Sequence, residues 1–181
     1  MHNANQETGS ETLAEKKPLE IRRVVTGHDA EGKAVIVDDK TMDNVIVMPS
    51  GHSGALMWVA DPGDAHVNGS VDQEGDRANR RLLGIAPPSG GHVFRILQLA
   101  PGKTAFMHRT DTIDYAIVLQ GACVMKLDGD EEVSMNAGDV LVQRGTWHGW
   151  ENRNDEPCRL AFILISSEAP EKHLHKKDGI P

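Results

Sequence analysis

The sequence predicts an all-β fold in which short strands close into a double-sheet barrel. Val, Ile and Leu gather in short runs, and glycine and aspartate punctuate the chain between them. Aromatic residues make up only 4% of the chain and glycine occurs 18 times, as expected of many short strands joined by tight turns. With 181 residues, the chain is long enough to bury one core without disulfides or structural metals.

The N-terminal part predicts a tail followed by an arm. Residues 1–18 contain almost no apolar side chains and are expected to be disordered, because they cannot bury enough surface to offset the entropy of ordering. Residues 19–91 are expected to pack on the barrel or extend it, and their first two apolar runs flank the turn-rich segment Gly27–Lys33, as in a β-hairpin. A long connection at 61–76 and a short helix at 77–83 are predicted to follow. The strands predicted in this part are Ile21–Val25, Ala34–Val37, Val45–Val47 and Leu56–Val59.

Residues 92–166 are predicted to form the barrel itself. Their apolar runs are short, regularly spaced and separated by turn residues, which favours antiparallel strands that close on themselves. Residues 167–181 are polar and are predicted to form a surface extension. The strands predicted in the barrel are Val93–Leu99, Tyr115–Leu119, Cys123–Leu127, Val133–Met135, Val140–Gln143 and Leu160–Ile165.

Composition and charge narrow the choice of partner. The net charge of −8 and the pI near 5.5 argue against nucleic acid or an anionic membrane surface, since both attract basic patches. No apolar run approaches the roughly 20 residues that a membrane helix requires. A small-molecule ligand and a cytoplasmic location are therefore expected, with Cys123 and Cys158 as free thiols.

Two histidine-centred segments, each opened by a glycine, carry the candidate chemistry. The first, Gly102–Gly121, contains His108, and the second, Gly138–Asn152, contains His148. Side chains alternate across a strand, so each histidine belongs to one definite face. If that face is the interior, an imidazole from each half of the barrel meets the other inside it.

These segments resemble the two sequence motifs of the cupin family. The family's first motif is glycine, five residues, His-x-His, three or four residues, Glu, six residues and glycine. Its second is glycine, five residues, Pro-x-Gly, two residues, His, three residues and Asn. The chain is similar to small single-domain cupins of the cupin-2 conserved-barrel type, here with a degenerate metal motif. The resemblance implies a jelly-roll barrel, the double-stranded β-helix, with an N-terminal β arm.

The resemblance also implies a metal site. Metal-containing cupins bind a divalent transition ion with three histidines and a glutamate, and His108, His148 and Asp114 fall on three of these positions, whereas Thr110 falls on the fourth. An Fe, Mn, Ni or Zn ion held by two imidazoles and one carboxylate is therefore expected, as in a non-haem iron triad. Because aspartate reaches about 1.5 Å less far than glutamate, direct ligation by Asp114, ligation through water and no ligation all stay open.

The second segment departs from the family at Arg144, where the family has proline, and it is one residue shorter before its histidine. Arg144 is expected either to pair with Asp114 in place of the metal or to bind a substrate carboxylate. Phe106, Thr110 and Trp150 are predicted to contact the substrate, although Phe106 and Trp150 suit the core equally well. The predicted catalytic residues are His108, Asp114, Arg144 and His148, and the predicted metal ligands are His108, Asp114 and His148.

The preferred function is a metal-dependent lyase or oxidoreductase, of decarboxylase, dehydratase or dioxygenase type. Its substrate is expected to be a small organic acid or an aromatic, polyketide-like metabolite. One alternative is a metal-free isomerase or lyase whose general base is His108 or His148, with Asp114 setting the pKa of that base. Another is a non-catalytic ligand-binding barrel. Unpaired arm strands need cover, which predicts a homodimer in which each arm adds to the other subunit's sheet.

Overall fold

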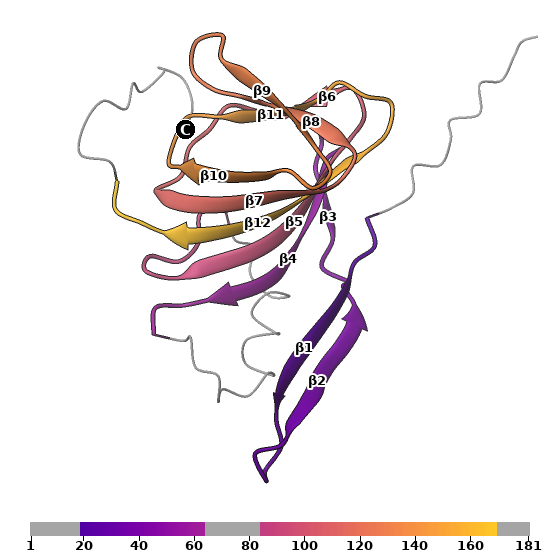
Figure 1. The fold of residues 1–181 in the computed structure, drawn as a ribbon, viewed down its shortest axis with the longest axis vertical. Coiled ribbons are helices and arrows are strands. Elements are labelled where there is room, and N and C mark those ends of the chain that lie inside the picture. Colours follow the sequence, from indigo (N-terminus) through magenta and orange to yellow (C-terminus); the bar gives the residue numbers. More distant parts are fainter. Residues whose placement is uncertain (1–18, 64–83, 170–181) are drawn as a thin grey trace, which may run out of the picture.

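The computed structural model describes residues 19–63 and 84–169, and in these ranges the chain forms strands and no helix (Figure 1). The all-β prediction is therefore confirmed. The predicted N-terminal tail, the helix at 77–83 and most of the C-terminal extension lie outside the described residues. No helix in the described part of the chain is long and apolar enough to cross a membrane.

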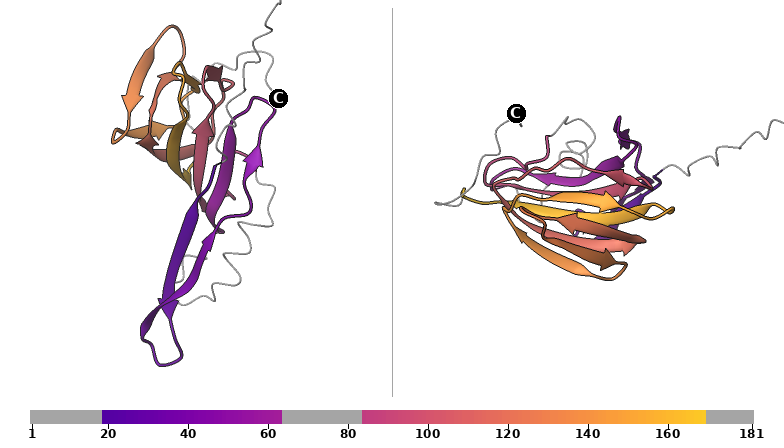
Figure 2. Two further views of the ribbon diagram at one scale, coloured as in Figure 1. Left: turned by 90° about the vertical axis from the view of Figure 1, so that its right-hand side faces the viewer. Right: turned by 90° about the horizontal axis from the view of Figure 1, so that it is seen from above.

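Two antiparallel sheets form the barrel (Figures 1 and 2). Six strands form the larger sheet in the order β10-β7-β12-β5-β4-β3, and four form the smaller one in the order β6-β11-β8-β9. The pairs β10-β7, β7-β12, β12-β5, β6-β11 and β11-β8 join strands that are not consecutive in the chain, as in the predicted jelly roll, which is confirmed. The strands are β3 (Ile46–Val47), β4 (Ser53–Ala60), β5 (His92–Leu99), β6 (Lys103–Thr104), β7 (Thr112–Gln120), β8 (Ala122–Lys126), β9 (Glu132–Asn136), β10 (Val140–Arg144), β11 (Gly149–Asn152) and β12 (Cys158–Ser166).

Each strand predicted from an apolar run is present, with ends shifted by a few residues. Two short strands were not predicted. Strand β6 has only two residues, and β11 begins with a glycine and ends with Glu151 and Asn152, so neither contains an apolar run. Both exist because β11 pairs with β6 on one side and with β8 on the other.

The core fills the space between the two sheets. Along β7, alternate residues from Thr112 to Val118 are buried and the residues between them face outward. Buried side chains of both sheets meet around Trp150, which contacts Phe162 edge to face with ring centroids 5.5 Å apart. The inner face of β7 also buries Asp114, which is only 4% exposed.

The predicted N-terminal β arm is a separate two-stranded sheet that projects away from the barrel (Figures 1 and 2). It consists of β1 (Arg22–His28) and β2 (Ala34–Thr41). Its base is fixed to the barrel by Arg23, which is 7% exposed, forms an ion pair with Asp38 and donates a 3.0 Å hydrogen bond to the Met57 carbonyl of β4.

Candidate active site

His108 and His148 meet at the ends of the barrel strands. His108 lies between β6 and β7, and His148 lies between β10 and β11. The backbone N–H of each histidine donates to the carbonyl of the other, at 2.9 Å in both directions. The centroids of the two imidazoles are 4.3 Å apart and the ring planes are inclined at 53°. The structure thus brings the two predicted histidines together.

Both imidazoles are held in the same tautomer by the same kind of contact. Nδ1 of His108 lies 3.1 Å from the carbonyl of Phe106, and Nδ1 of His148 lies 3.0 Å from the carbonyl of Thr146. A carbonyl oxygen can only accept a hydrogen bond, so each Nδ1 carries the proton and donates. Each Nε2 therefore keeps its lone pair, which is the form of imidazole that binds a metal ion or accepts a proton.

Gln143 of β10 connects His148 to Asp114. Its amide nitrogen donates to Asp114 Oδ2 at 3.2 Å. The same nitrogen contacts the His148 ring, at 2.9 Å from Nδ1 and 3.2 Å from Nε2. Two buried oxygens in this group, Asp114 Oδ1 and Gln143 Oε1, have no hydrogen-bond partner. Buried acceptors normally find a partner, so these two oxygens indicate a site built for a ligand.

Burial sets the protonation of the site. It lowers the pKa of His148 to about 4, with a smaller contribution from neighbouring His108. It also lowers the pKa of His108. Both imidazoles are therefore neutral at pH 7. Burial raises the pKa of Asp114 above its ordinary range, although the Thr112 hydroxyl and the positive charge of Arg95 act in the opposite direction.

Arg95 of β5 is a cation whose charge reaches this group of side chains. Its charge acts on both Asp114 and His108. Its Nη2 donates to the carbonyls of Gly84, at 3.3 Å, and Ile85, at 2.7 Å, and its buried Nε has no partner. The guanidinium therefore retains donor capacity beside the histidine pair.

The structure corrects the prediction for Arg144. Its side chain is exposed on the outer face of β10, and the Asp114 carboxylate is bonded to Gln143 instead. The predicted pairing of Arg144 with Asp114 is therefore wrong. Strand alternation explains the error, because Gln143 and Arg144 are adjacent and only one of them can face inward. In β10, Val140 and Val142 face outward and Leu141 faces inward, so the alternation places Gln143 rather than Arg144 on the inner face.

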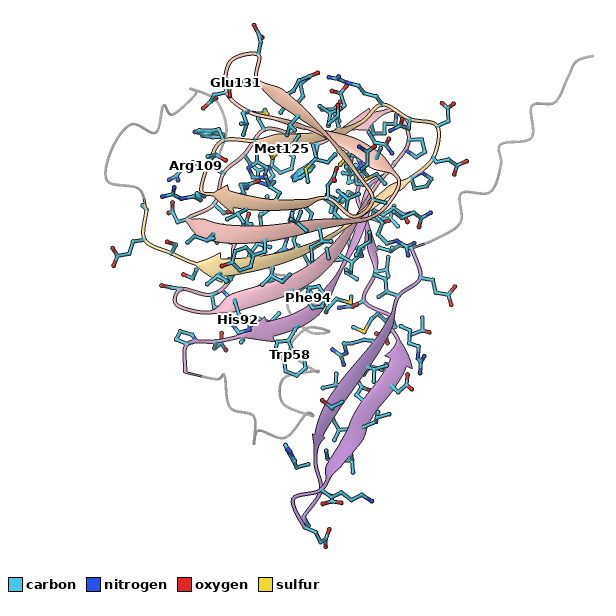
Figure 3. The ribbon with its side chains drawn as sticks, in the orientation of Figure 1. Trp58, His92, Phe94, Arg109, Met125 and Glu131 are labelled. Carbon is cyan, nitrogen blue, oxygen red and sulfur yellow. The ribbon has the colours of Figure 1, made fainter. Side chains whose placement is uncertain are left out.

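The predicted substrate contacts lie in three different environments. Phe106 is 62% exposed, although its ring is 5.0 Å from that of His108. Trp150 is 2% exposed and belongs to the core, with its ring edge-on to His148 at 6.5 Å. Figure 3 labels Met125 of that core, which lies opposite Trp150 in the smaller sheet. The Thr110 hydroxyl is bonded to that of Thr112 at 2.6 Å.

The predicted ligand triad is not formed. Among residues 19–63 and 84–169, no three His, Cys, Asp or Glu side chains are grouped closely enough to hold a metal ion. The Gln143 amide lies between the Asp114 carboxylate and His148. The histidine pair still fits a transition metal, because both rings are neutral and have a fixed tautomer. Gln143 Oε1, which has no hydrogen-bond partner, is an uncharged oxygen of the same group.

Comparison with known proteins identifies the family to which the chain is similar. Residues 95–165 match the family model described as Cupin domain, Cupin_2. The cupin-domain-containing oxidoreductase fogC of Aspergillus ruber is 31% identical over 149 residues, covering 80% of this chain and 72% of the relative. The cupin-domain-containing oxidoreductase srdB of Neurospora crassa is 35% identical over 145 residues, covering 79% and 72%.

A third relative extends the match. Phomopsin biosynthesis cluster protein C' of Diaporthe leptostromiformis is 32% identical over 164 residues, covering 84% of both chains. These matches extend well beyond residues 95–165. On its two-sheet topology, its paired histidine segments and these similarities, the chain belongs to the cupin family.

Proposed function

We propose that this cupin is a small-molecule enzyme of the oxidoreductase type, in which His108 and His148 bind a divalent transition metal ion through Nε2. The observation that carries the proposal is the matched pair of tautomers, since each Nδ1 donates to the carbonyl two residues before it. Such outer contacts orient histidine ligands and fix which nitrogen is free. Two relatives named as oxidoreductases support this class over a lyase.

Gln143 and Asp114 complete the proposed site. Gln143 Oε1 is a buried, uncharged oxygen without a hydrogen-bond partner, and Asp114 orients the Gln143 amide. Two imidazoles with one amide oxygen form a donor set of mixed nitrogen and oxygen, which suits Fe, Mn, Ni or Zn. When bound, the ion would supply Lewis acidity at a substrate oxygen.

The metal-free alternative is weaker on physical grounds. A general base works best when its pKa lies near the working pH. Burial lowers the pKa of His148 to about 4, so its neutral form is abundant at pH 7 but its affinity for a proton is low. A metal ligand, in contrast, benefits from an imidazole that stays neutral.

Arg95 supports an anionic substrate. It takes the role that the sequence gave to Arg144, because it lies near the histidine pair and its Nε is free to donate. A guanidinium binds carboxylates and other planar anions through paired hydrogen bonds. We therefore propose a small organic acid, or an aromatic, polyketide-like metabolite with an acidic oxygen. The third relative is named as a protein of the phomopsin biosynthesis cluster, which is consistent with a small-molecule substrate from a biosynthetic pathway. The proposal includes the cytoplasmic location and the homodimer expected from the sequence.

Metal content tests the proposal directly. Tag-free, dialysed full-length protein should contain a stoichiometric transition metal by elemental analysis, and His108→Ala and His148→Ala should both lose it. His92→Ala is the matched control, because His92 lies on β5 outside this group, and it should keep the metal. Wild-type protein that stays metal-free after incubation with Fe(II), Mn(II), Ni(II) and Zn(II) would refute the metal site. Activity that survives chelation but not His148→Ala would favour the metal-free base.

A further inference from the structure

The histidine pair has a second side, formed by the residues next to it in the chain. His108 and His148 exchange both backbone hydrogen bonds, at 2.9 Å each, so they lie directly opposite one another in an antiparallel bridge. Arg109 follows the first histidine and Trp147 precedes the second, which places these two residues opposite each other as well. Since side chains alternate along an extended chain, Arg109 and Trp147 lie on the face of the bridge away from the imidazoles.

The same register holds on the other side of the bridge. Met107 lies opposite Gly149, because a Cβ added to Gly149 would come within 2.8 Å of the Met107 sulfur. Met107 and Arg109 are two residues apart and therefore share a face. Figure 3 labels Arg109 at the edge of the barrel. The bridge thus presents the imidazoles on one face and the pair of Arg109 and Trp147 on the other.

Both side chains of this pair carry a buried donor without an acceptor. Arg109 is 21% exposed and forms an ion pair with Asp111, whose carboxylate lies 2.9 Å from its Nη2. Among the residues that the structure describes, no hydrogen-bond partner is present for the buried Nη1 of Arg109 or the buried Nε1 of Trp147. Guanidinium and indole nitrogens can only donate. Buried donors normally find an acceptor, so two of them on one face indicate a site built for an acceptor group.

The chemistry of the two donors selects the ligand. A water molecule that accepts from both would bring two donors of its own, which need further acceptors. The oxygens of a carboxylate only accept, and those of a phosphate mainly accept. A guanidinium binds either group with charge-assisted hydrogen bonds, which are stronger than neutral ones. An oxyanion therefore satisfies this pair better than a water molecule.

We propose that Arg109 Nη1 and Trp147 Nε1 bind a small oxyanion, a carboxylate or phosphate group, on the outer side of the histidine bridge. An anion bonded to both side chains joins the two chain segments that carry His108 and His148. The site is distinct from the substrate site proposed at Arg95 and does not depend on the metal chemistry.

Anion titration of the metal-free, full-length protein tests the site. Sodium phosphate and sodium acetate are titrated separately at constant ionic strength, with sodium chloride as background, by calorimetry and tryptophan fluorescence. The wild type should bind at least one of the two anions, and the anion that binds identifies the group. Arg109→Gln should weaken binding at least about tenfold, because it removes a charged donor. Trp147→Phe removes the N–H donor and should weaken binding about two- to tenfold.

Asp111→Asn should have the opposite effect. Asp111 is 49% exposed and competes with the anion for the same guanidinium. Removal of its charge should tighten anion binding about two- to fivefold, as expected for an exposed ion pair. A purely structural role of Arg109 predicts no such gain. Asp155→Asn is the control of equal charge, because Asp155 is exposed in the turn between β11 and β12, and it should keep the wild-type affinity.

Arg144→Gln is the matched control for Arg109→Gln, since its side chain is exposed on β10 and the charge lost is the same. It should bind the anion like the wild type, and circular dichroism checks that each variant is folded. A wild type that binds neither anion would overturn the site, as would binding that persists in both Arg109→Gln and Trp147→Phe. Binding lost in Arg95→Gln but kept in those two variants would place the anion at the substrate site instead. Metal content is measured separately, so none of these results bears on the metal.

Discussion

The two faces of the six-stranded sheet each depart from the usual distribution of side chains, with polar groups at one end of the inner face and apolar groups exposed on the outer face. The inner row that crosses β10, β7, β12, β5 and β4 is Gln143, Asp114, Leu164, Val93 and Val59. All five are buried, and it begins with an amide and a carboxyl group. The outer row, one residue away on the opposite face, is apolar and only partly buried, and it consists of Val142, Tyr115, Ile163, Phe94 and Trp58. Buried polar and exposed apolar groups are the informative exceptions in a protein, and here they face opposite sides of the same strands.

The two faces of this sheet therefore have different roles. The polar end of the inner row supports the histidine pair, whereas its apolar end belongs to the core. The outer row contributes less to the core, because its side chains are partly exposed. Substitutions in the two rows should therefore change the free energy of unfolding by different amounts.

The largest expected effect comes from the apolar end of the inner row. Leu164→Ala should lower the free energy of unfolding by about 2–5 kcal/mol, because it leaves a cavity in a buried cluster. Urea denaturation at low protein concentration measures it. A loss below about 1 kcal/mol would mean that the row is not close-packed.

The next effect is a pH dependence set by His148. Its pKa falls from 6.5 in the unfolded chain to about 4 in the fold, so the unfolded state binds more protons between these values and stability rises with pH across this window. The metal-free protein should lose up to about 3 kcal/mol between pH 7 and pH 4. The raised pKa of Asp114 acts with the opposite sign near the acid end.

Urea unfolding of wild type and His148→Gln at pH 7, 5.5 and 4.5 measures this dependence. The slope should be shallower in the variant. Equal slopes would show that His148 is not the group responsible.

Gln143→Leu should have a smaller effect that appears mainly in metal binding. It removes the proposed amide-oxygen donor together with the hydrogen bond to Asp114. Loss of an outer contact alone typically weakens a metal site about 10- to 100-fold, so the affinity should fall by at least this factor. Titration with Co(II), followed by absorbance, measures the affinity. Arg144→Leu is the matched control, because it alters the adjacent but exposed side chain and should leave the affinity unchanged. Equal affinities in the two variants would remove Gln143 from the site.

The smallest effect is expected in the outer row. Val142→Ala should change the free energy of unfolding of the monomer by no more than about 0.5 kcal/mol, since the side chain is 60% exposed. Urea unfolding at low protein concentration gives this value. A destabilisation approaching that of Leu164→Ala would abolish the distinction between the two rows.

The positions of most strands and of the two histidines could be predicted from local sequence patterns. Apolar runs located every long strand, and the spacing of the glycine-opened segments identified His108 and His148 as partners. Prediction failed where residues depend on a neighbouring strand. Strand β11 contains no apolar run and exists through pairing with β6 and β8. Arg95 was missed because nothing in its own strand marks it as close to the histidines.

The sequence by itself determined that alternate residues of each strand face opposite sides, and that two imidazoles belong to this family's motif positions. Only the tertiary structure decided which side is inside and which strands are neighbours. The physical reason is that the side-chain period of a strand is two, so a register difference of one residue exchanges the faces. That exchange placed Gln143 inside and Arg144 outside, and it aligned five apolar side chains from distant parts of the chain into one row.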